Sequence, residues 1–118
     1  MSEDIEVLKH KAVHKGELCF EGLYIDKCTR IVVHKENEID LAYTEFEILL
    51  LLAQNAGIVF SKEQIYEAVF GYDGTADDTA VTQHIKNIRA KLRTAGVAAP
   101  ETVLKTIWGV GYQWKSET

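Results

Sequence analysis

The segment DTAVTQHIKNIRAKLRT, residues 78–94, carries the strongest structural signal in the chain. Its apolar side chains recur at the i, i+4, i+7 and i+11 spacing that places them on one face of a helix. These side chains are Val81, Ile85, Ile88 and Leu92. We therefore predict an amphipathic helix over residues 79–94 that is anchored to a core by this apolar stripe.

The opposite face of the predicted helix carries amides, hydroxyls and cations but no carboxylate. Its members are Thr79, Thr82, Gln83, Lys86, Asn87, Ala90 and Arg93. Such a face fits a negative surface with hydrogen-bonding edges, as in a DNA major groove. It is equally typical of an ordinary solvated helix, so the helix alone leaves both interpretations open.

Length and composition predict one modest globular domain. The chain has 118 residues, of which 47% are hydrophobic, enough for a single core. It contains neither a signal peptide nor an apolar run long enough to span a membrane, so we expect a cytoplasmic protein without membrane contact. Cys19 and Cys28 are too few for a disulfide scaffold, and we expect reduced thiols whose role stays open. His10 and His14 lack a third ligand nearby, and no metal or other cofactor is expected.

The charge is unevenly distributed along the chain. The net charge of −5 argues against a general nucleic-acid coat protein. Residues 1–61 hold six Lys/Arg and eleven Asp/Glu, residues 62–114 hold six of each, and residues 79–94 hold four cations and no acid. A long-range field this weak predicts modest, salt-sensitive affinity of one copy for a polyanion.

The first half of the chain predicts a small sheet. Short apolar and β-branched runs alternate with turn residues, which predicts an antiparallel meander with one covered face. The four predicted strands are residues 18–20, 23–26, 30–34 and 38–41. Within them, Ile31 and Val33 share one side of the third strand, and Ile39 and Leu41 share one side of the fourth.

Two capping boxes mark helices in the middle of the chain. The box TEFE at residues 44–47 predicts a helix that runs to Gln54 and stops before Gly57. Because it is apolar on nearly all sides, we expect this helix to be the central core helix.

The second box, SKEQ at residues 61–64, predicts a helix over residues 62–70 that ends at Gly71. Its inward side chains are expected to be Ile65, Ala68 and Val69.

The remaining segments complete a recognisable element order. Asp77 and Asp78 are placed to cap the helix over residues 79–94. Residues 94–102 contain the only proline and are expected to be irregular, and residues 103–114 predict a hairpin about a glycine-bearing turn. A sheet, three helices and a hairpin make an α+β winged helix-turn-helix.

Five sequence blocks in this order resemble the winged-helix effector domain of OmpR/PhoB-type response regulators, over about residues 16–114. The blocks are LAYTEFEILLLL (41–52), NAGIVFSKEQ (55–64), VFGYD (69–73), HIKNIRAKL (84–92) and TIWGVGY (106–112). The resemblance implies an N-terminal four-stranded sheet, three helices and a C-terminal wing. It further implies sequence-specific binding of double-stranded DNA by a bacterial two-component transcription regulator.

The resemblance also assigns candidate residues. The helix over residues 79–94 would enter the major groove and the wing would approach a neighbouring minor groove, while a loop would touch RNA polymerase. The implied DNA contacts are Thr79, Thr82, Gln83, Lys86, Asn87, Lys91, Arg93, Lys105, Thr106, Trp108 and Gly109. The implied polymerase contacts are Gly71, Tyr72, Asp73, Gly74, Thr75 and Ala76.

The chain departs from the family pattern at three positions. Many members carry arginine in the wing, where this chain has Trp108 and, after Gly-Tyr, Gln113. The usual arginine at the start of the recognition helix is Thr79 here. Each missing cation removes a candidate phosphate or minor-groove contact. Trp108 is a core residue, a stacking contact or an interface anchor, and we favour core packing.

The family pairs this domain with a phosphoacceptor receiver domain and a partner histidine kinase. We expect residues 1–15 to be a linker or tail, 16–115 the winged-helix domain and 116–118 a C-terminal tail, with the chain an excised fragment rather than a stand-alone relative. The family further implies a homodimer on direct repeats once the receiver is phosphorylated. The alternative function is a protein-interaction module with weak or no DNA binding. No motif predicts an enzyme.

Overall fold

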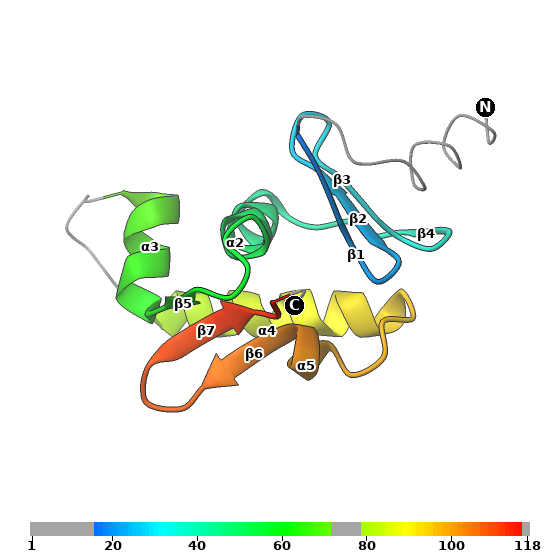
Figure 1. Ribbon diagram of the computed structural model, residues 1–118. Coiled ribbons are helices and arrows are strands. Elements are labelled where there is room, and N and C mark those ends of the chain that lie inside the picture. The colour runs from blue at the N-terminus through cyan, green and yellow to red at the C-terminus, as the bar shows by residue number, and fades with distance from the viewer. Residues whose placement is uncertain (1–15, 72–78, 117–118) are drawn as a thin grey trace.

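The computed structural model describes residues 16–71 and 79–116. The described chain forms two small sheets and a group of helices (Figure 1). The N-terminal strands are β1 (Glu17–Phe20), β2 (Leu23–Asp26), β3 (Ile31–His34) and β4 (Asn37–Glu38). The helices are α2 (Tyr43–Ala53), α3 (Lys62–Phe70), α4 (Thr79–Thr94) and α5 (Pro100–Val103). The remaining strands are β5 (Val59–Phe60), β6 (Leu104–Ile107) and β7 (Gly111–Trp114).

The predicted N-terminal meander is confirmed. Its strands pair antiparallel in the order β1-β2-β3-β4. Ile25 and Val32 face the core at 0% and 1% exposure, whereas Ile31 lies on the outer face at 41%. The fourth strand is shorter than predicted, covering only Asn37–Glu38. The amide of Ile39 still donates to the Val32 carbonyl of β3 at 2.8 Å, and its side chain is buried in the core.

Helix α2 is the central core helix, as predicted, but the predicted capping box is wrong. The helix begins at Tyr43 with Ala42 as the N-cap, so Thr44 lies within the first turn and caps nothing. Alanine has no side-chain oxygen, so only half of a box forms. In that half, Oε1 of Glu45 accepts a hydrogen bond from the Ala42 amide at 2.9 Å.

Helix α3 has the predicted bounds and cap. Ser61 Oγ accepts from the Gln64 amide, and the Gln64 side chain accepts from the Ser61 amide. Ile65 is fully buried, but the inward placement of Ala68 is wrong because this residue is exposed. Tyr66 is half-buried, and its ring stacks on that of Phe70 with centroids 4.7 Å apart.

The C-terminal hairpin is confirmed as β6 and β7, and β5 joins it to give a three-stranded sheet in the order β5-β7-β6. The pairing of β5 was not predicted. The expectation of a wholly irregular segment before the hairpin is wrong, because Pro100 opens the short helix α5. Proline suits this first helical position since its fixed φ is already helical.

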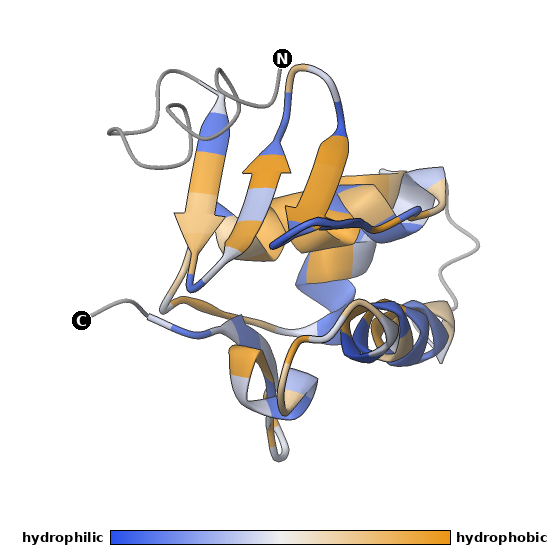
Figure 2. Cartoon of the chain, turned by 90° about the vertical axis from the view of Figure 1, so that its right-hand side faces the viewer, coloured by the Kyte–Doolittle hydropathy of each residue, from blue (hydrophilic) through white to orange (hydrophobic). Residues whose placement is uncertain are grey.

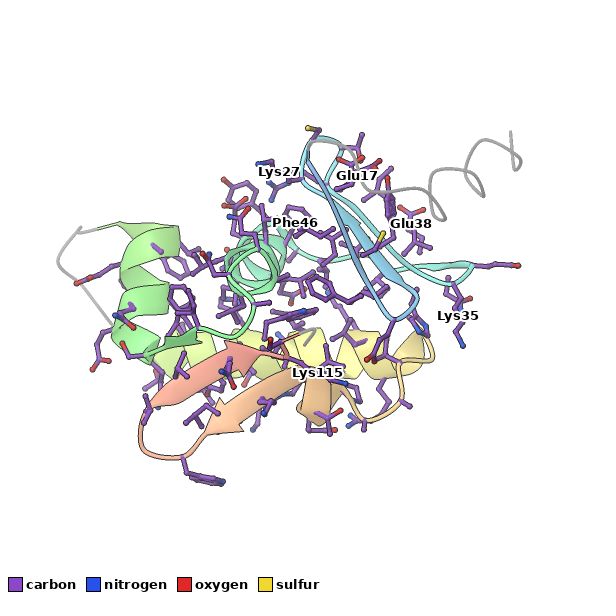
Figure 3. All side chains as sticks on the ribbon, in the orientation of Figure 1. Glu17, Lys27, Lys35, Glu38, Phe46 and Lys115 are labelled. Atoms are coloured by element: carbon purple, nitrogen blue, oxygen red, sulfur yellow. The ribbon has the colours of Figure 1, made fainter. Side chains whose placement is uncertain are left out.

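Helix α4 lies beneath α2 and the N-terminal sheet, and the hairpin packs along its side (Figure 1). Apolar faces of the sheet and helices turn toward each other, while one side of α4 is hydrophilic (Figure 2). Side chains fill the space between these layers (Figure 3). The predicted stripe of α4 is confirmed, with its four residues 0–1% exposed. None of the helices that the structure describes is long and apolar enough to cross a membrane.

Candidate nucleic-acid interface

The polar face of α4 is open to solvent. Thr79, Gln83, Lys86 and Arg93 are exposed, and Asn87 is half-buried. The buried stripe on the opposite side fixes the rotation of the helix, which is why this face must point outward.

Several of these polar groups already interact. Gln83 Nε2 donates to Asn87 Oδ1 at 3.1 Å, one helical turn away. The hydroxyls of Thr82 and Tyr112 approach to 3.5 Å, which links α4 to β7. Lys86 pairs with none of the described carboxylates, so its ammonium is available to an anion.

Lys91 and Arg93, two of the predicted DNA contacts, already form ion pairs within the chain. Lys91 Nζ lies 2.7 Å from Oε1 of Glu45, which is 5% exposed. Burial raises the pKa of Glu45, but hydrogen bonds from Lys91, Ala42 and Asn87 outweigh this effect and leave the pKa below its usual value. Arg93 pairs with Glu101 at the surface, and this hydrogen bond lowers the pKa of Glu101.

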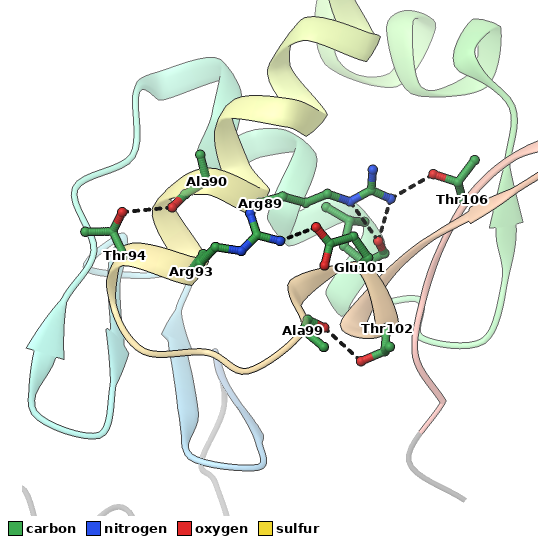
Figure 4. Close-up of polar contacts among 9 residues, drawn as sticks. Arg89, Ala90, Arg93, Thr94, Ala99, Glu101, Thr102 and Thr106 are labelled. Atoms are coloured by element: carbon green, nitrogen blue, oxygen red, sulfur yellow. Dashed lines mark hydrogen bonds and ion pairs between the residues drawn. The ribbon is translucent and has the colours of Figure 1, made fainter.

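Arg89 joins α4 to the wing, a role that we did not predict. Its Nε and Nη2 donate to the Leu104 carbonyl at 3.0 and 2.6 Å, and Nη2 also reaches Thr106 Oγ1 at 2.9 Å (Figure 4). Burial lowers the pKa of Arg89. A sequence signal existed, because Arg89 lies four residues from Ile85 and so borders the buried stripe.

The wing projects beyond the core, and its tip is apolar. Trp108 is 91% exposed and Val110 is 57% exposed. The favoured core packing of Trp108 is therefore wrong, which leaves a stacking contact or an interface anchor. Gly109 has a φ of +77°, which an L-residue rarely adopts, and it allows the sharp turn. Lys105 and Thr106 are exposed on β6.

A surface hollow runs between the start of α3, the polar side of α4 and the wing. It collects three cations from two helices, Lys62 of α3 with Lys86 and Arg89 of α4, together with the carboxylate of Glu63 and wing residues such as Thr106 and Trp108. Of the predicted DNA contacts, the hollow brings together Thr82, Lys86, Thr106, Trp108 and Gly109. The other six predicted contacts, Thr79, Gln83, Asn87, Lys91, Arg93 and Lys105, lie outside its lining.

Of the predicted polymerase loop, only Gly71 is described. It is the C-cap of α3, with a φ of 82°. The other five loop residues, and the capping residues Asp77 and Asp78, lie outside the described residues.

Comparison with known proteins identifies this arrangement. Residues 36–114 match the family described as "Transcriptional regulatory protein, C terminal". The chain belongs to this family. Among curated proteins, the chain is similar to the transcriptional regulatory protein SpaR of Bacillus subtilis, with 35% identity over 86% of this chain and 44% of SpaR. The regulatory protein VanRB of Enterococcus faecalis is 49% identical over 64% of this chain and 31% of VanRB. The chain thus spans less than half the length of these relatives.

Solved structures give the same assignment. The response regulator DrrB of Thermotoga maritima, an OmpR/PhoB homologue, aligns with a TM-score of 0.71 and 38% identity over 86% of this chain and 45% of DrrB. The DNA-binding domain of Klebsiella pneumoniae RstA, solved with its RstA box, aligns with a TM-score of 0.72 and 28% identity over 86% of this chain and 98% of that domain. The winged-helix OmpR/PhoB-type effector fold inferred from the sequence is therefore confirmed.

Proposed function

We propose that this domain binds double-stranded DNA in a sequence-specific manner and thereby regulates transcription in a bacterial two-component system. The observation that carries the proposal is the exposed, carboxylate-free face of α4 beside a projecting wing. The RstA domain, which has the same fold, was solved on its DNA box, and this supports the assignment. In the proposed complex α4 lies in the major groove and the wing reaches the adjacent minor groove.

Four of the proposed contacts have an assigned role. Gln83 and Asn87 read base edges, because an amide offers one donor and one acceptor to adenine. Lys86 meets a phosphate or a guanine, and Arg93 exchanges Glu101 for a phosphate, since an exposed ion pair holds it only weakly. The remaining proposed contacts are Thr79, Thr82, Lys91, Lys105, Thr106, Trp108 and Gly109.

The proposal extends to the wider regulator. A receiver domain, phosphorylated by a histidine kinase, would promote a homodimer on direct repeats, and two linked copies would offset the weak attraction of one. Residues 16–115 would be the DNA-binding domain, residues 1–15 the linker and residues 116–118 the tail. The loop from Gly71 to Ala76 would contact RNA polymerase. The protein would act in the cytoplasm, without enzymatic activity or a cofactor.

Selection of binding sites from random duplexes, followed by NMR titration, tests the proposal. We expect one enriched sequence and amide shift changes confined to residues 79–94 and 104–111 at low salt. If neither occurs while a protein partner perturbs the wing, the domain is an interaction module rather than a DNA reader.

A further inference from the structure

A cavity lies where the N-terminal sheet meets the end of β7, and it shares no lining residue with the hollow beside α4. We call it the Trp114 cavity. Its walls come from the β1–β2 turn, the end of β3, the segment after α4, α5 and the end of β7. Its volume is about 220 Å³, and an engineered cavity of about 150 Å³ already holds benzene. The Trp114 cavity therefore has room for one small ring that bears a polar group.

Most of the wall of the Trp114 cavity is apolar. Leu23, Val97 and Trp114 belong to the buried core, and Val103 borders it. The ring of Phe20 packs edge-on against Trp114 with centroids 5.4 Å apart. Because the core holds these side chains in place, the cavity is preformed and favours a ligand with an apolar body.

One buried donor in this wall has no partner. Trp114 is fully buried, and its Nε1–H meets no acceptor among the described residues. An indole N–H can only donate, and a buried donor without an acceptor destabilises the fold. Because Trp114 lines the cavity, a ligand that carries an acceptor can complete this hydrogen bond.

His34 brings a second buried polar ring to the same wall. It is 6% exposed, and its Nδ1 lies 2.9 Å from the Ala95 carbonyl oxygen. A carbonyl oxygen only accepts, so this nitrogen carries the proton of the contact and Nε2 is left as the ring atom that a ligand can meet. Two buried rings, from β3 and β7, thus place nitrogen atoms around one cavity.

Exposed lysines stand at the mouth of the cavity. Lys35 follows β3 and Lys115 follows β7 (Figure 3). Glu21 is the carboxylate in the lining, and its Oε2 lies 3.0 Å from Lys115 Nζ. Both members of this pair are exposed, so it is held only weakly. Two cations and one carboxylate leave a net positive charge, which favours an anion.

We propose that the Trp114 cavity binds a small organic acid. The carboxylate of the ligand accepts from Trp114 Nε1–H and is attracted by Lys35 and Lys115, and its apolar body packs against Phe20 and Val103. An inorganic anion would satisfy the charge but leave the apolar wall uncovered. This inference goes beyond DNA binding and does not depend on it.

NMR titration of the wild-type chain with benzoate at pH 7 tests the proposal. The chain has two indole N–H resonances, and W108F removes one of them, which assigns the other to Trp114. We expect benzoate to shift the Trp114 resonance and the amides of Gly96 and Val97, which also line the cavity. The shifts should saturate with a Kd of about 1 mM or lower, while the Trp108 resonance stays unchanged.

The charge of the ligand is tested with benzamide, which has the same size and keeps a carbonyl acceptor but is neutral. We expect it to bind about fivefold more weakly than benzoate, or weaker still. The double variant K35Q/K115Q should weaken benzoate binding by a similar factor and leave benzamide binding unchanged. K27Q is the matched control, because Lys27 lies at the opposite end of the N-terminal sheet (Figure 3), and it should alter neither affinity.

The role of the buried donor is tested with W114F, which keeps an aromatic ring but lacks the N–H. Benzoate should bind this variant about tenfold more weakly or worse, as followed by the Gly96 and Val97 amides. If W114F does not fold, the wild-type titration decides the point, because a hydrogen bond to the carboxylate should move the Trp114 N–H proton downfield.

Three outcomes would overturn the proposal. The first is a Trp114 resonance that does not move at the highest soluble benzoate concentration. The second is an equal shift of both indole resonances, which would show that benzoate adheres to the surface in general. The third is benzamide binding as tight as benzoate binding, since the cavity would then not select an acid.

Discussion

Single side chains on α4 and the wing differ in how free they are to meet a partner. Lys86 is exposed and pairs with none of the described carboxylates, whereas Lys91 and Arg93 each hold one within the chain. A cation that already has a partner must exchange it before it binds a phosphate, and this exchange reduces its net contribution. Among the cations of α4, Lys86 should therefore contribute most to attraction of DNA.

Replacement of Lys86 by alanine should weaken DNA binding and lower the salt slope of the binding constant by about one unit if the ammonium meets a phosphate. The slope is measured by titration at several salt concentrations. K27A, in the β2–β3 turn at the far end of the N-terminal sheet (Figure 3), is the control and should leave the slope unchanged. An unchanged slope for K86A with an altered base preference would place Lys86 on a base edge.

The two tryptophans should report wing contact separately. Trp108 is 91% exposed, while Trp114 is fully buried and packs edge-on against Phe20 at 5.4 Å. Iodide should quench Trp108 in the free protein and lose access to it when DNA is added. W108F retains the buried fluorophore and should show no such protection. Equal iodide quenching of the wild-type chain with and without DNA would mean that the wing tip stays in water.

Secondary-structure elements are held in register by contacts that only their packing creates. Arg89 joins α4 to β6 through three hydrogen bonds, which tie the candidate reading helix to the wing. Gly111 of β7 lies so close to β5 that a Cβ there would collide with the Phe60 carbonyl oxygen. These two contacts set the distance between the surfaces that face the hollow.

The R89M variant should lose about 1–3 kcal/mol of unfolding free energy, because it removes the donors for a partly buried carbonyl. Urea unfolding gives the energy, and amide shifts of residues 104–107 show whether the wing moves. R93M, which breaks an exposed ion pair with Glu101, is the control and should cost less than about 1 kcal/mol. Equal costs for the two variants would contradict the bridging role of Arg89.

The G111A variant should destabilise the domain by about 1–3 kcal/mol, because the added methyl forces β5 and β7 apart. G109A is the matched comparison: its φ of +77° strains alanine, but open space surrounds it, so a cost of about 1 kcal/mol is expected. Thermal and urea unfolding measure both. A smaller effect at Gly111 than at Gly109 would refute the close approach of β5.

At the scale of the whole molecule, stability should depend on pH through the contact between α2 and α4. The pKa of Glu45 is lower in the folded state than its ordinary value of 4.5. The contribution of this carboxylate to the free energy of unfolding is therefore complete above pH 4.5, and it is lost as pH falls through the lowered pKa. Unfolding free energies at pH 7 and pH 3 should therefore differ less in E45Q than in the wild-type chain. E47Q should retain the wild-type difference. If E45Q loses as much unfolding free energy between pH 7 and pH 3 as the wild-type chain does, Glu45 is not the origin of the pH dependence.

The sequence alone determined the N-terminal meander, the three longer helices, the hairpin and the core stripe of α4, because the hydrophobic period acts locally. It also placed the N-cap of α3 at Ser61, since both halves of that box lie within four residues. It missed α5 and misplaced the cap of α2. The family followed from the resemblance of five sequence blocks.

Tertiary structure alone decided which polar groups are free. Lys91 and Glu45 form an ion pair although they are 46 residues apart in the chain, and β5 pairs with the distant strand β7. No local sequence pattern predicts either contact. The exposure of Trp108 was likewise undecided, because a large aromatic residue favours burial only where the fold provides a cavity for it. Local chemistry fixes the helices and strands, and packing between distant segments fixes which side chains remain for a partner.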